Sequence, residues 1–183
     1  MSAEKFRTEM GDIQLRKADD KDLISLQKIG KLTFSETFSS DNSENNLRSY
    51  LDTAFSTEKV KGELSDENSE FYFAELENEI IGYLKVNYGD SQTEIRSEKA
   101  VEIERIYVLK EFHGKKVGQI LYEKAIELVK DIDDDFIWLG VWEQNPRAIR
   151  FYEKNGFSAF DKHIFQLGND EQTDIMMKLK LKH

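Results

Sequence analysis

The spacing of apolar residues along the chain predicts a fold in which helices and strands alternate. Apolar residues at every second position predict a short strand at residues 13–16. An acidic stretch from Asp19 precedes apolar residues at helical spacing, which predicts a helix that ends near Phe38. Aromatic and β-branched runs at 71–76 and 80–88, separated by a short polar turn, predict a hairpin. Two further helices are expected at 44–52 and 57–64.

The second half of the chain repeats the order strand then helix twice and closes with two strands. A strand at 100–108 is followed by a helix at 115–132 that carries its apolar residues on one face. A strand at 138–142 is followed by a helix that Pro146 opens at its first turn. The closing strands are expected at 158–166 and 173–181. This order predicts an α/β fold with a mixed sheet.

Length and composition indicate one domain, 1–183, with a flexible tail expected at 1–11. A chain of 183 residues with 39% hydrophobic residues and 12 Phe has enough apolar side chains for a core. The absence of cysteine excludes disulfides, thiolate metal sites and a cysteine nucleophile. The acidic run at 131–135 suggests a metal cluster or a solvated loop. The loop is favoured, because acids around a helix C-terminus are more often solvated, and no metal is expected.

A net charge of −10 opposes a general role in nucleic-acid binding, because the phosphates would be repelled. The same charge would attract a cationic substrate, although acidity that only keeps a small protein in solution is an equal alternative. The first residues lack the apolar run of a secretory signal, and no stretch has the ~18 to 20 apolar residues of a membrane span. We therefore expect a cytoplasmic protein with no membrane partner.

A glycine-containing turn after the strand that ends at Val108 is a candidate anion site. It reads H-G-K-K-V-G-Q at 113–119, where the next helix begins. Glycine lets the backbone approach a ligand closely, and the exposed N–H groups of a first helical turn suit a pyrophosphate. Lys115 and Lys116 add positive charge there. An ordinary capped turn is the alternative, because this glycine spacing alone is a weak signal.

The segment at 143–157 has a much more specific pattern. It reads E-Q-N-P-R-A-I-R-F-Y-E-K-N-G-F. This segment resembles the core of the GNAT (GCN5-related N-acetyltransferase) superfamily, whose run Asn-x-x-Ala-x-x-Phe-Tyr-x-x-x-Gly-Phe corresponds to Asn145, Ala148, Phe151, Tyr152, Gly156 and Phe157. The runs E-I-E-R-I-Y-V, I-W-L-G-V-W-E and G-N-D-E-Q-T-D-I-M extend the likeness over nearly the whole chain. They are similar to the PaiA-type spermidine/spermine acetyltransferases of Gram-positive bacteria.

The resemblance implies a mixed, mostly antiparallel sheet of six to seven strands, flanked by helices, in which two parallel central strands splay apart. The corresponding segments are 104–108 and 138–142, and the pantetheine arm of acetyl-CoA would insert between them. A backbone N–H near the thioester carbonyl is implied at Tyr107 or Val108. The implied cofactor-binding residues are Ile106, Tyr107, Val108, His113, Gly114, Lys115, Lys116, Val117, Gly118, Gln119, Gly140, Val141, Asn145, Ala148, Tyr152 and Lys154.

Two positions of the turn differ from the family pattern Arg/Gln-x-x-Gly-x-Gly/Ala. His113 stands at the first position and Lys116 at the first glycine, whereas Gly118 keeps the second small position and Gly114 is an additional glycine. A positive φ would strain Lys116, because it has a side chain. We therefore expect helical φ and ψ at Lys116. The departure lowers the expected affinity for the cofactor and leaves its identity unchanged.

The resemblance implies that an amine attacks the thioester directly in a ternary complex, with Tyr152 as the general acid beside the sulfur. A packed core aromatic is the alternative for Tyr152. Glu102 and Glu104 are two apart on one strand, so their side chains point to one face and either is a candidate base. A role limited to attracting the cation stands level with the base role. His163 ranks lower as a base, because a lone histidine late in a strand is more often structural.

In folds of this kind the first helices and their loop build the acceptor pocket, here residues 34–46, with help from the last hairpin. The resemblance favours a polyamine such as spermidine or spermine as the acceptor. Candidate substrate contacts are Phe34, Glu36, Asp41 and Glu44, with Tyr72, Tyr83 or Tyr88 as candidate cation–π partners.

Two alternatives to a polyamine acetyltransferase stay open. The first keeps the chemistry and changes the acceptor to a protein N-terminus, a lysine or an aminoglycoside. The second is an acyl-CoA-sensing regulatory protein, because PaiA-type proteins are associated with negative regulation of protease and sporulation genes. Direct DNA contact is disfavoured by the negative charge and by the lack of a basic helix-turn-helix pattern. A homodimer is a further expectation, because many relatives of this kind are dimers.

Overall fold

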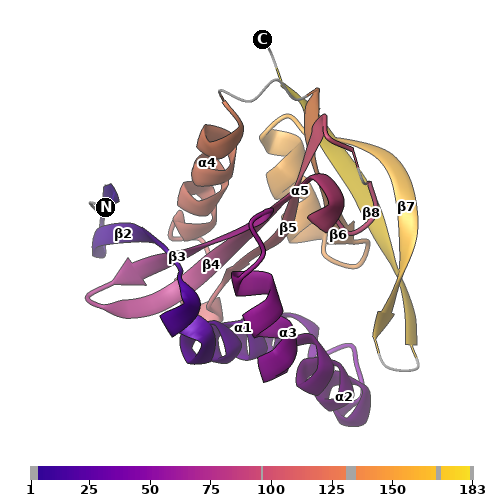
Figure 1. Ribbon diagram of the computed structural model, residues 1–183, viewed down its shortest axis with the longest axis horizontal. Coiled ribbons are helices and arrows are strands. Elements are labelled where there is room, and N and C mark those ends of the chain that lie inside the picture. Colours follow the sequence, from indigo (N-terminus) through magenta and orange to yellow (C-terminus); the bar gives the residue numbers. More distant parts are fainter. Residues whose placement is uncertain (1–3, 96, 131–134, 168–169, 182–183) are drawn as a thin grey trace.

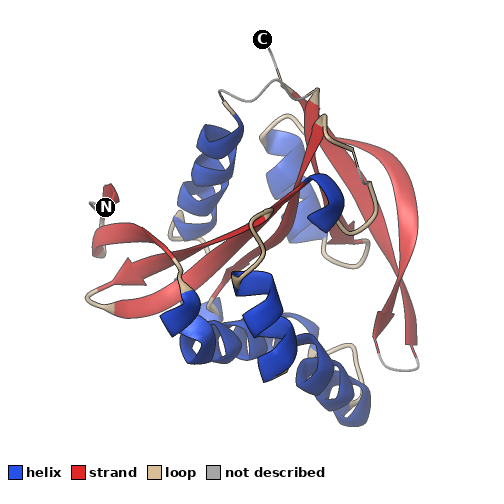
Figure 2. Ribbon diagram, in the orientation of Figure 1, coloured by secondary structure: helices blue, strands red, loops and turns tan. Residues whose placement is uncertain are grey.

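The computed structural model describes residues 4–95, 97–130, 135–167 and 170–181, and these residues form one eight-stranded mixed sheet flanked by helices (Figures 1 and 2). The strand order is β1-β2-β3-β4-β5-β6-β8-β7. The strands are β1 (Glu4–Thr8), β2 (Gly11–Lys17), β3 (Ser69–Leu76), β4 (Glu79–Tyr88), β5 (Ala100–Val108), β6 (Phe136–Trp142), β7 (Ser158–Leu167) and β8 (Asp170–Lys180). The helices are α1 (Leu23–Phe38), α2 (Glu44–Ala54), α3 (Thr57–Leu64), α4 (Val117–Val129) and α5 (Pro146–Lys154). The predicted α/β class is confirmed.

The helices divide between the two faces of the sheet, so that each face has its own hydrophobic core (Figure 1). On one face, α4 packs Val117, Leu121 and Ala125 against the sheet, all at 0% exposure. These residues repeat every four positions, which places them in one stripe along the helix. On the other face, α1, α2 and α3 bury a second, aromatic-rich cluster around Phe34 and Phe55. No helix among the described residues is long and apolar enough to span a membrane.

The sheet opens between β5 and β6, which are parallel and paired only at their beginnings. The last paired residues are Glu102 and Trp138, and the strands separate beyond this point. A β-bulge on β5 lies nearby, because Lys85 of β4 is opposite Arg105 whereas the next residue, Val86, is opposite Ile103. Glu104 is therefore the extra residue of the bulge. The expected pair of splayed parallel central strands is confirmed.

The expectation of a flexible tail at 1–11 is wrong for Glu4–Thr8, which forms edge strand β1 and pairs antiparallel with β2. This strand explains why the sheet has eight strands where six to seven were expected. The run E-K-F-R-T has Phe6 as its one large apolar residue, so hydrophobic alternation carries little signal there. Pairing with β2, the packing of Phe6 and an ion pair between Glu4 and Lys124 at 2.7 Å hold the strand in place. The acidic run at 131–134 lies outside the described residues.

Candidate active site

Two cavities meet where β5 and β6 separate. The first, which we call the α1-side cavity, has a volume of about 290 Å³ and is lined by residues of α1, β5, β6, β7 and β8. The second, the α4-side cavity, has a volume of about 460 Å³ and lies among α4, α5 and the end of β5. Both cavities are lined by Thr37, Ile106, Tyr107, Asn145, Ala148 and Tyr152. The opening in the sheet therefore connects two binding spaces that belong to opposite faces.

Tyr152 lies in the shared wall of the two cavities. Its ring is held by Phe151 and Phe157, with centroid distances of 5.2 Å and 5.7 Å. The side chain is buried, and burial raises the pKa of its hydroxyl above the ordinary value of 10.0. The phenol therefore keeps its proton at neutral pH. The sequence-based alternatives for Tyr152, a packed aromatic and a proton donor, are compatible in this position.

Asn145 and Ala148 of the 143–157 segment organise the start of α5. The Asn145 side-chain oxygen accepts a hydrogen bond from the Ala148 N–H at 3.1 Å, so Asn145 is the N-cap of the helix. Pro146 follows at the first helical position, as expected. The cap fixes the direction in which α5 leaves β6, and thereby places Tyr152 two turns further along at the opening.

The N-terminus of α4 lines the α4-side cavity and has the polarity that suits an anion. Its first N–H groups have no partners inside the helix and carry the positive end of the helix dipole. Lys116 and Lys154 line the same cavity. Thirteen of the expected cofactor-binding residues line it: Ile106, Tyr107, Val108, His113, Gly114, Lys116, Val117, Gly118, Gln119, Asn145, Ala148, Tyr152 and Lys154. The other three lie elsewhere, since Gly140 and Val141 line the α1-side cavity and Lys115 covers the Phe112 ring.

Arg147 is a cavity residue that the sequence analysis did not single out. It donates from Nη1 to Nδ1 of His113 at 2.6 Å, and His113 donates in turn from Nε2 to the Val108 carbonyl at 2.8 Å. Burial lowers the pKa of His113, so the imidazole is neutral and suited to this arrangement. Arg147 thereby adds a positive charge at the mouth of the α4-side cavity. The variable position after Pro146 in the motif gave no signal for it.

The expected helical conformation of Lys116 is wrong. Lys116 is the N-cap of α4 and adopts the left-handed conformation, with φ 66° and ψ 2°. Gly114, two residues earlier, also has a positive φ of 78°. The left-handed residue joins the turn to the first residue of α4, and the chain adopts this conformation despite the lysine side chain. The backbone of Lys116 is therefore strained, because its residue type does not favour the conformation that it adopts.

Replacement of Lys116 by glycine is expected to raise the free energy of unfolding by about 1 kcal/mol, because a left-handed residue with a Cβ is strained by about that amount. Urea unfolding of the ligand-free protein measures the change. The matched control is Lys115→Gly, which should lower stability, because Lys115 does not have a positive φ and its ammonium lies over Phe112. Equal effects of the two substitutions would contradict the strain at Lys116.

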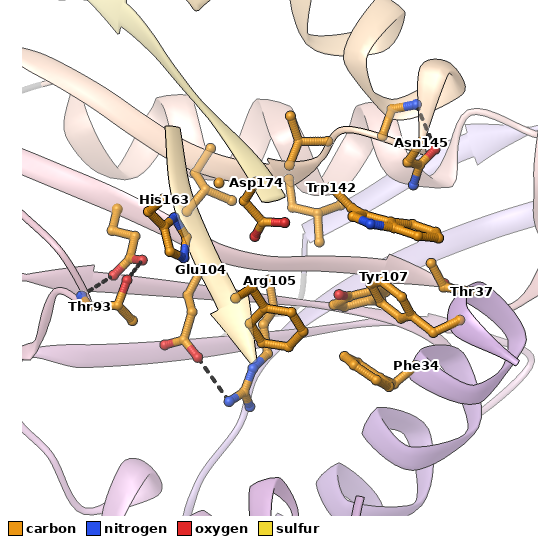
Figure 3. A pocket seen from close by; sticks show the side chains of 18 of the residues that line it. Phe34, Thr37, Thr93, Glu104, Arg105, Tyr107, Trp142, Asn145, His163 and Asp174 are labelled. Atoms are coloured by element: carbon orange, nitrogen blue, oxygen red, sulfur yellow. Dashed lines mark hydrogen bonds and ion pairs between the residues drawn. The ribbon is translucent and has the colours of Figure 1, made fainter. Parts of the chain in front are cut away.

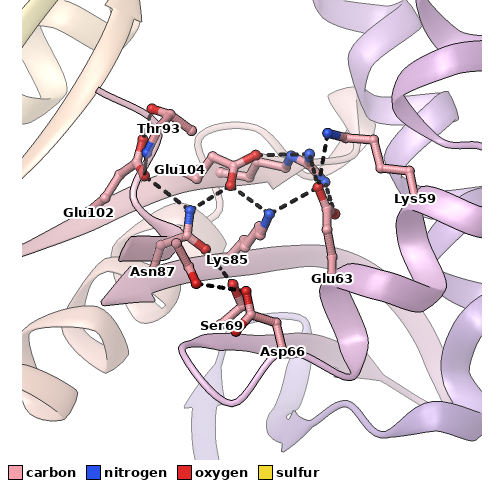
Figure 4. A network of polar contacts seen from close by, with 11 residues as sticks. Lys59, Glu63, Asp66, Ser69, Lys85, Asn87, Thr93, Glu102 and Glu104 are labelled. Atoms are coloured by element: carbon pink, nitrogen blue, oxygen red, sulfur yellow. Dashed lines mark hydrogen bonds and ion pairs between the residues drawn. The ribbon is translucent and has the colours of Figure 1, made fainter. Parts of the chain in front are cut away.

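Glu102 and Glu104 point to one face, as expected, because the Asn87 side-chain amide donates to both, at 3.0 Å and 2.6 Å. Both line the α1-side cavity. Their carboxylates are nevertheless occupied (Figure 4). Glu102 accepts hydrogen bonds from the Thr93 N–H and hydroxyl, and burial raises the pKa of its carboxyl. These contacts leave little room for either residue to bind an additional proton donor.

Glu104 belongs to a closed ring of charges with Lys85, Glu63 and Arg105 (Figure 4). Lys85 Nζ lies 2.6 Å from Glu104 and 3.0 Å from Glu63, and Arg105 Nη2 lies 2.8 Å and 3.2 Å from the same two carboxylates. The two cations lower the pKa of Glu104 to about 2, against the opposing effect of burial. The ring joins α3 to the bulge of β5. Glu104 is thus ionised and fully paired.

The predicted acceptor contacts are dispersed. Phe34 lines the α1-side cavity beside Tyr107, with ring centroids 6.3 Å apart. Glu36 accepts a hydrogen bond from the Lys110 N–H at 2.8 Å and, like Asp41, lines a separate surface hollow. Glu44 is an exposed residue of the first turn of α2 and lines none of these cavities. Of this group, Phe34 alone lies at the opening.

The three tyrosines proposed for cation–π contacts lie outside both cavities. Tyr72 donates its hydroxyl to Glu70 at 2.7 Å on the α4 face of the sheet. Tyr88 packs against the same core. Tyr83 is fully buried and stacks beneath Tyr107 with ring centroids 6.0 Å apart.

Asp174 of β8 is a cavity residue that the sequence analysis missed. Its side chain points into the α1-side cavity between His163 and Trp142 (Figure 3). Burial raises the pKa of this carboxyl to about 6. The sequence carried no signal for it, because Asp174 shares a face of the strand with Lys178 and Lys180 and so fits the polar side of the alternation. His163 lies on the neighbouring strand directly opposite Asp174.

Comparison with known proteins agrees with this geometry. Residues 31–157 match the model of the acetyltransferase (GNAT) family. An uncharacterized N-acetyltransferase of Lactobacillus delbrueckii subsp. lactis, from the pepI 3′ region, is 37% identical over 172 residues, which cover 94% of this chain and 99% of that protein. A spermidine N(1)-acetyltransferase of Thermoplasma acidophilum is 29% identical over 153 residues, with coverage of 81% and 90%.

Solved structures give the same result. The crystal structure of the PaiA N-acetyltransferase of Thermoplasma acidophilum in complex with coenzyme A superposes with a TM-score of 0.75 at 25% identity, and covers 92% of this chain and 98% of that one. The family match spans more than half of the chain and includes both the splayed strands and the α5 motif. The chain therefore belongs to the GNAT family of N-acetyltransferases.

Proposed function

We propose that this protein transfers the acetyl group of acetyl-CoA to a primary amine of a polyamine, with both substrates bound together. The observation that carries the proposal is the meeting of two cavities at the splayed strands, with Tyr152 in their common wall. One cavity presents an anion site and the other presents carboxylates. A thioester entering from one face and an amine entering from the other would meet at the opening.

The α4-side cavity has features that suit coenzyme A. The N–H groups of α4, together with Lys116, Lys154 and Arg147, offer donors and positive charge for its phosphates. The pantetheine arm needs polar backbone partners, and β5 supplies them beyond Glu102, where its pairing with β6 ends. The PaiA structure that is similar to this chain was solved with coenzyme A bound.

Strand alternation indicates which backbone groups of β5 face the opening. The N–H of Leu109, the residue after β5, donates to the Ile81 carbonyl at 2.9 Å, and Tyr107 is opposite Tyr83, so Tyr107 and Leu109 direct their polar groups toward β4. In an antiparallel pair successive residues alternate in this direction. The N–H groups of Ile106 and Val108 therefore point toward β6. Of the two expected oxyanion donors, Tyr107 and Val108, the alternation favours Val108.

When bound, acetyl-CoA supplies an activated acyl group with a thiolate as the leaving group. The Val108 N–H would stabilise the negative charge that develops on the carbonyl oxygen. Tyr152 would donate its proton to the sulfur as the carbon–sulfur bond breaks. The contacts of its ring with Phe151 and Phe157 hold the hydroxyl of Tyr152 in a fixed position for this transfer.

The α1-side cavity favours a cationic acceptor. Glu104 is paired with Arg105 and Glu102 is bound by Thr93 and Asn87, whereas Asp174 lines the cavity without a lysine or arginine partner among the described residues. The remaining wall is aromatic, with Phe34, Tyr107, Trp142 and Phe165. A polyamine matches both features, since its ammonium groups need carboxylates or aromatic faces and its methylene segments need apolar contact. The similarity to a spermidine N(1)-acetyltransferase supports the same class.

The test is amine-dependent release of free thiol from acetyl-CoA by the purified protein. We expect spermidine and spermine to stimulate release most strongly, with the acetylated amine identified by mass spectrometry. Reactions without protein control for direct acetylation of each amine. Stimulation only by a peptide N-terminus, a lysine peptide or an aminoglycoside would contradict the polyamine assignment. Absence of stimulation by every amine would contradict acetyl transfer and leave a role in sensing acyl-CoA.

A further inference from the structure

Asp174 of β8 and His163 of β7 converge on Gly140 of β6, beyond Trp138, the last residue of β6 that pairs with β5. Asp174 of β8 is opposite Trp142 of β6 and His163 of β7. The side chains of Asp174 and His163 lie over Gly140. A Cβ on that glycine would lie 3.3 Å from Asp174 Oδ2 and 3.5 Å from His163 Cε1. The missing side chain at Gly140 leaves the space that the carboxylate occupies. Asp174 is thereby brought to the opening of the sheet (Figure 3).

Asp174 differs from the other carboxylates of the α1-side cavity in the number of partners that its carboxylate oxygens have. Glu104 is bound by Lys85 and Arg105, and Glu102 accepts hydrogen bonds from Thr93 and Asn87. Within the described parts of the chain, Asp174 has no ion pair with lysine or arginine and accepts no hydrogen bond. Its oxygens are therefore available to a ligand. Burial also raises the pKa of Asp174 to about 6, which suits a group that exchanges a proton near neutral pH.

His163 extends this arrangement toward the surface. Its Nδ1 is buried and has no hydrogen-bond partner among the described residues. Its Nε2 lies 3.8 Å from Oε1 of Glu94, whose side chain is 45% exposed. Asp174, His163 and Glu94 thus form a line of titratable groups from the opening of the sheet to solvent. A histidine with a purely structural role would normally have its buried ring nitrogen hydrogen-bonded, whereas Nδ1 of His163 has no such partner among the described residues.

We infer that Asp174 is the catalytic base that takes the proton from the attacking ammonium, and that His163 is a positioning residue that adjusts the charge of Asp174 and relays the proton outward. This inference rests on the proposed function. It assigns the proton transfer to β8 rather than to Glu102 or Glu104 of β5, and leaves those two residues with structural and electrostatic roles.

The protons balance in this scheme. The ammonium gives one proton to Asp174, and the nitrogen lone pair forms the carbon–nitrogen bond as the carbon–sulfur bond breaks. Tyr152 gives its proton to the leaving sulfur and regains one from the nitrogen as the amide forms. Asp174 then releases its proton to solvent through His163. The net products are the N-acetylated amine, the free thiol and one proton.

The first test is the pH dependence of kcat/KM for Asp174→Asn, measured from about pH 5 to pH 9 with the best amine acceptor. The wild type should lose activity on the acidic side with a midpoint near pH 6, where Asp174 becomes protonated. The variant should be about 100-fold less active at pH 7.5, a typical contribution of a general base, and should lack this acidic transition. Its affinity for coenzyme A should be unchanged, because Asp174 does not line the α4-side cavity.

The second variant, His163→Gln, gives a readout that a structural role would not produce. The charged groups that act on Asp174 are His163 of β7, which lowers its pKa, and Glu143 at the end of β6, which raises it. Glu102, Glu104 and Arg105 of β5 and Glu94 line the same cavity. Removal of the imidazole should therefore move the acidic transition to higher pH. Glu171→Gln on the exposed part of β8 is the matched control and should leave the profile unchanged.

The outcomes separate this inference from the function on which it rests. A wild type that acetylates an amine, with an Asp174→Asn variant that keeps the acidic transition and the full rate, overturns the base and leaves the acetyltransferase intact. A wild type that acetylates no amine overturns the proposed function instead. If Asp174→Asn does not fold, the His163→Gln profile decides, and an unmoved transition overturns the inference.

Discussion

Replacement of Tyr152 by phenylalanine should lower kcat on the order of 1,000-fold and leave the affinity for coenzyme A within about twofold of the wild type. A positioned proton donor accelerates a reaction by about 10² to 10⁴. The substitution removes the hydroxyl alone, and the ring keeps its contacts with Phe151 and Phe157. Steady-state thiol release gives kcat, and calorimetric titration gives the affinity for coenzyme A.

Tyr122→Phe is the matched control for this prediction. Tyr122 belongs to the same aromatic group, with its ring centroid 6.0 Å from Phe151, and its hydroxyl donates to the Asn155 carbonyl at 3.3 Å. It lines neither cavity. Loss of this hydroxyl should change kcat less than about twofold and cost about 1 kcal/mol of stability. Equal kcat values for Tyr152→Phe and the wild type would exclude Tyr152 as the acid.

Replacement of Glu104 by glutamine should lower the free energy of unfolding by about 3 kcal/mol at pH 7, because loss of one member leaves the buried cations of the ring under-compensated. Lys85 and Arg105 would then share Glu63 as their nearest carboxylate. Urea unfolding monitored by fluorescence measures the difference. Glu143→Gln is the control, since Glu143 forms an exposed pair with Lys162 at 3.3 Å and should change stability by less than about 1 kcal/mol.

The difference in the free energy of unfolding between the wild type and Glu104→Gln should become smaller as the pH falls. The pKa of Glu104 is lowered from 4.5 to about 2 in the folded protein, so the unfolded chain binds the proton more readily. The stabilisation by Glu104 is therefore complete above pH ~5 and is lost as the pH falls toward 2. The free energies of unfolding of the wild type and of Glu104→Gln should therefore approach each other as the pH falls over this range. A gap that stays constant with pH would contradict the ionised, paired state of Glu104.

The sequence predicted the elements that have strong periodicity or strong chemistry. α4 has a regular apolar stripe, the β3–β4 hairpin is dense in aromatic residues, and the α5 motif fixes a cap and an aromatic cluster. β1 escaped prediction because Phe6 is its one large apolar residue, and its pairing with β2 and the ion pair between Glu4 and Lys124 cannot be read from local periodicity. Local propensity also failed at Lys116, where the geometry of the turn overrides the preference of a residue with a Cβ.

The acceptor side of the site was the least predictable. Its walls come from α1, β5, β6, β7 and β8, which are far apart in the sequence, and spacing along the chain does not report which of them converge. Glu36 and Asp41 were reasonable candidates on charge, but the Glu36 carboxylate is bound by the Lys110 N–H and both residues line a separate hollow. Conversely, Asp174 could not be predicted, because only the folded sheet brings Gly140 and His163 beside it.

The bulge at Glu104 has a consequence for how β5 can evolve. Val101 and Ile103 before it, and Ile106 and Val108 after it, all contribute to the α4-side core, although a regular strand would turn odd and even positions to opposite faces. The inserted residue shifts the two-residue alternation of side chains between the faces of the sheet by one position. Deletion of a single residue at this point would swap the inward and outward sets of the second half of the strand. Changes of length should therefore be far less tolerated here than changes of side chain.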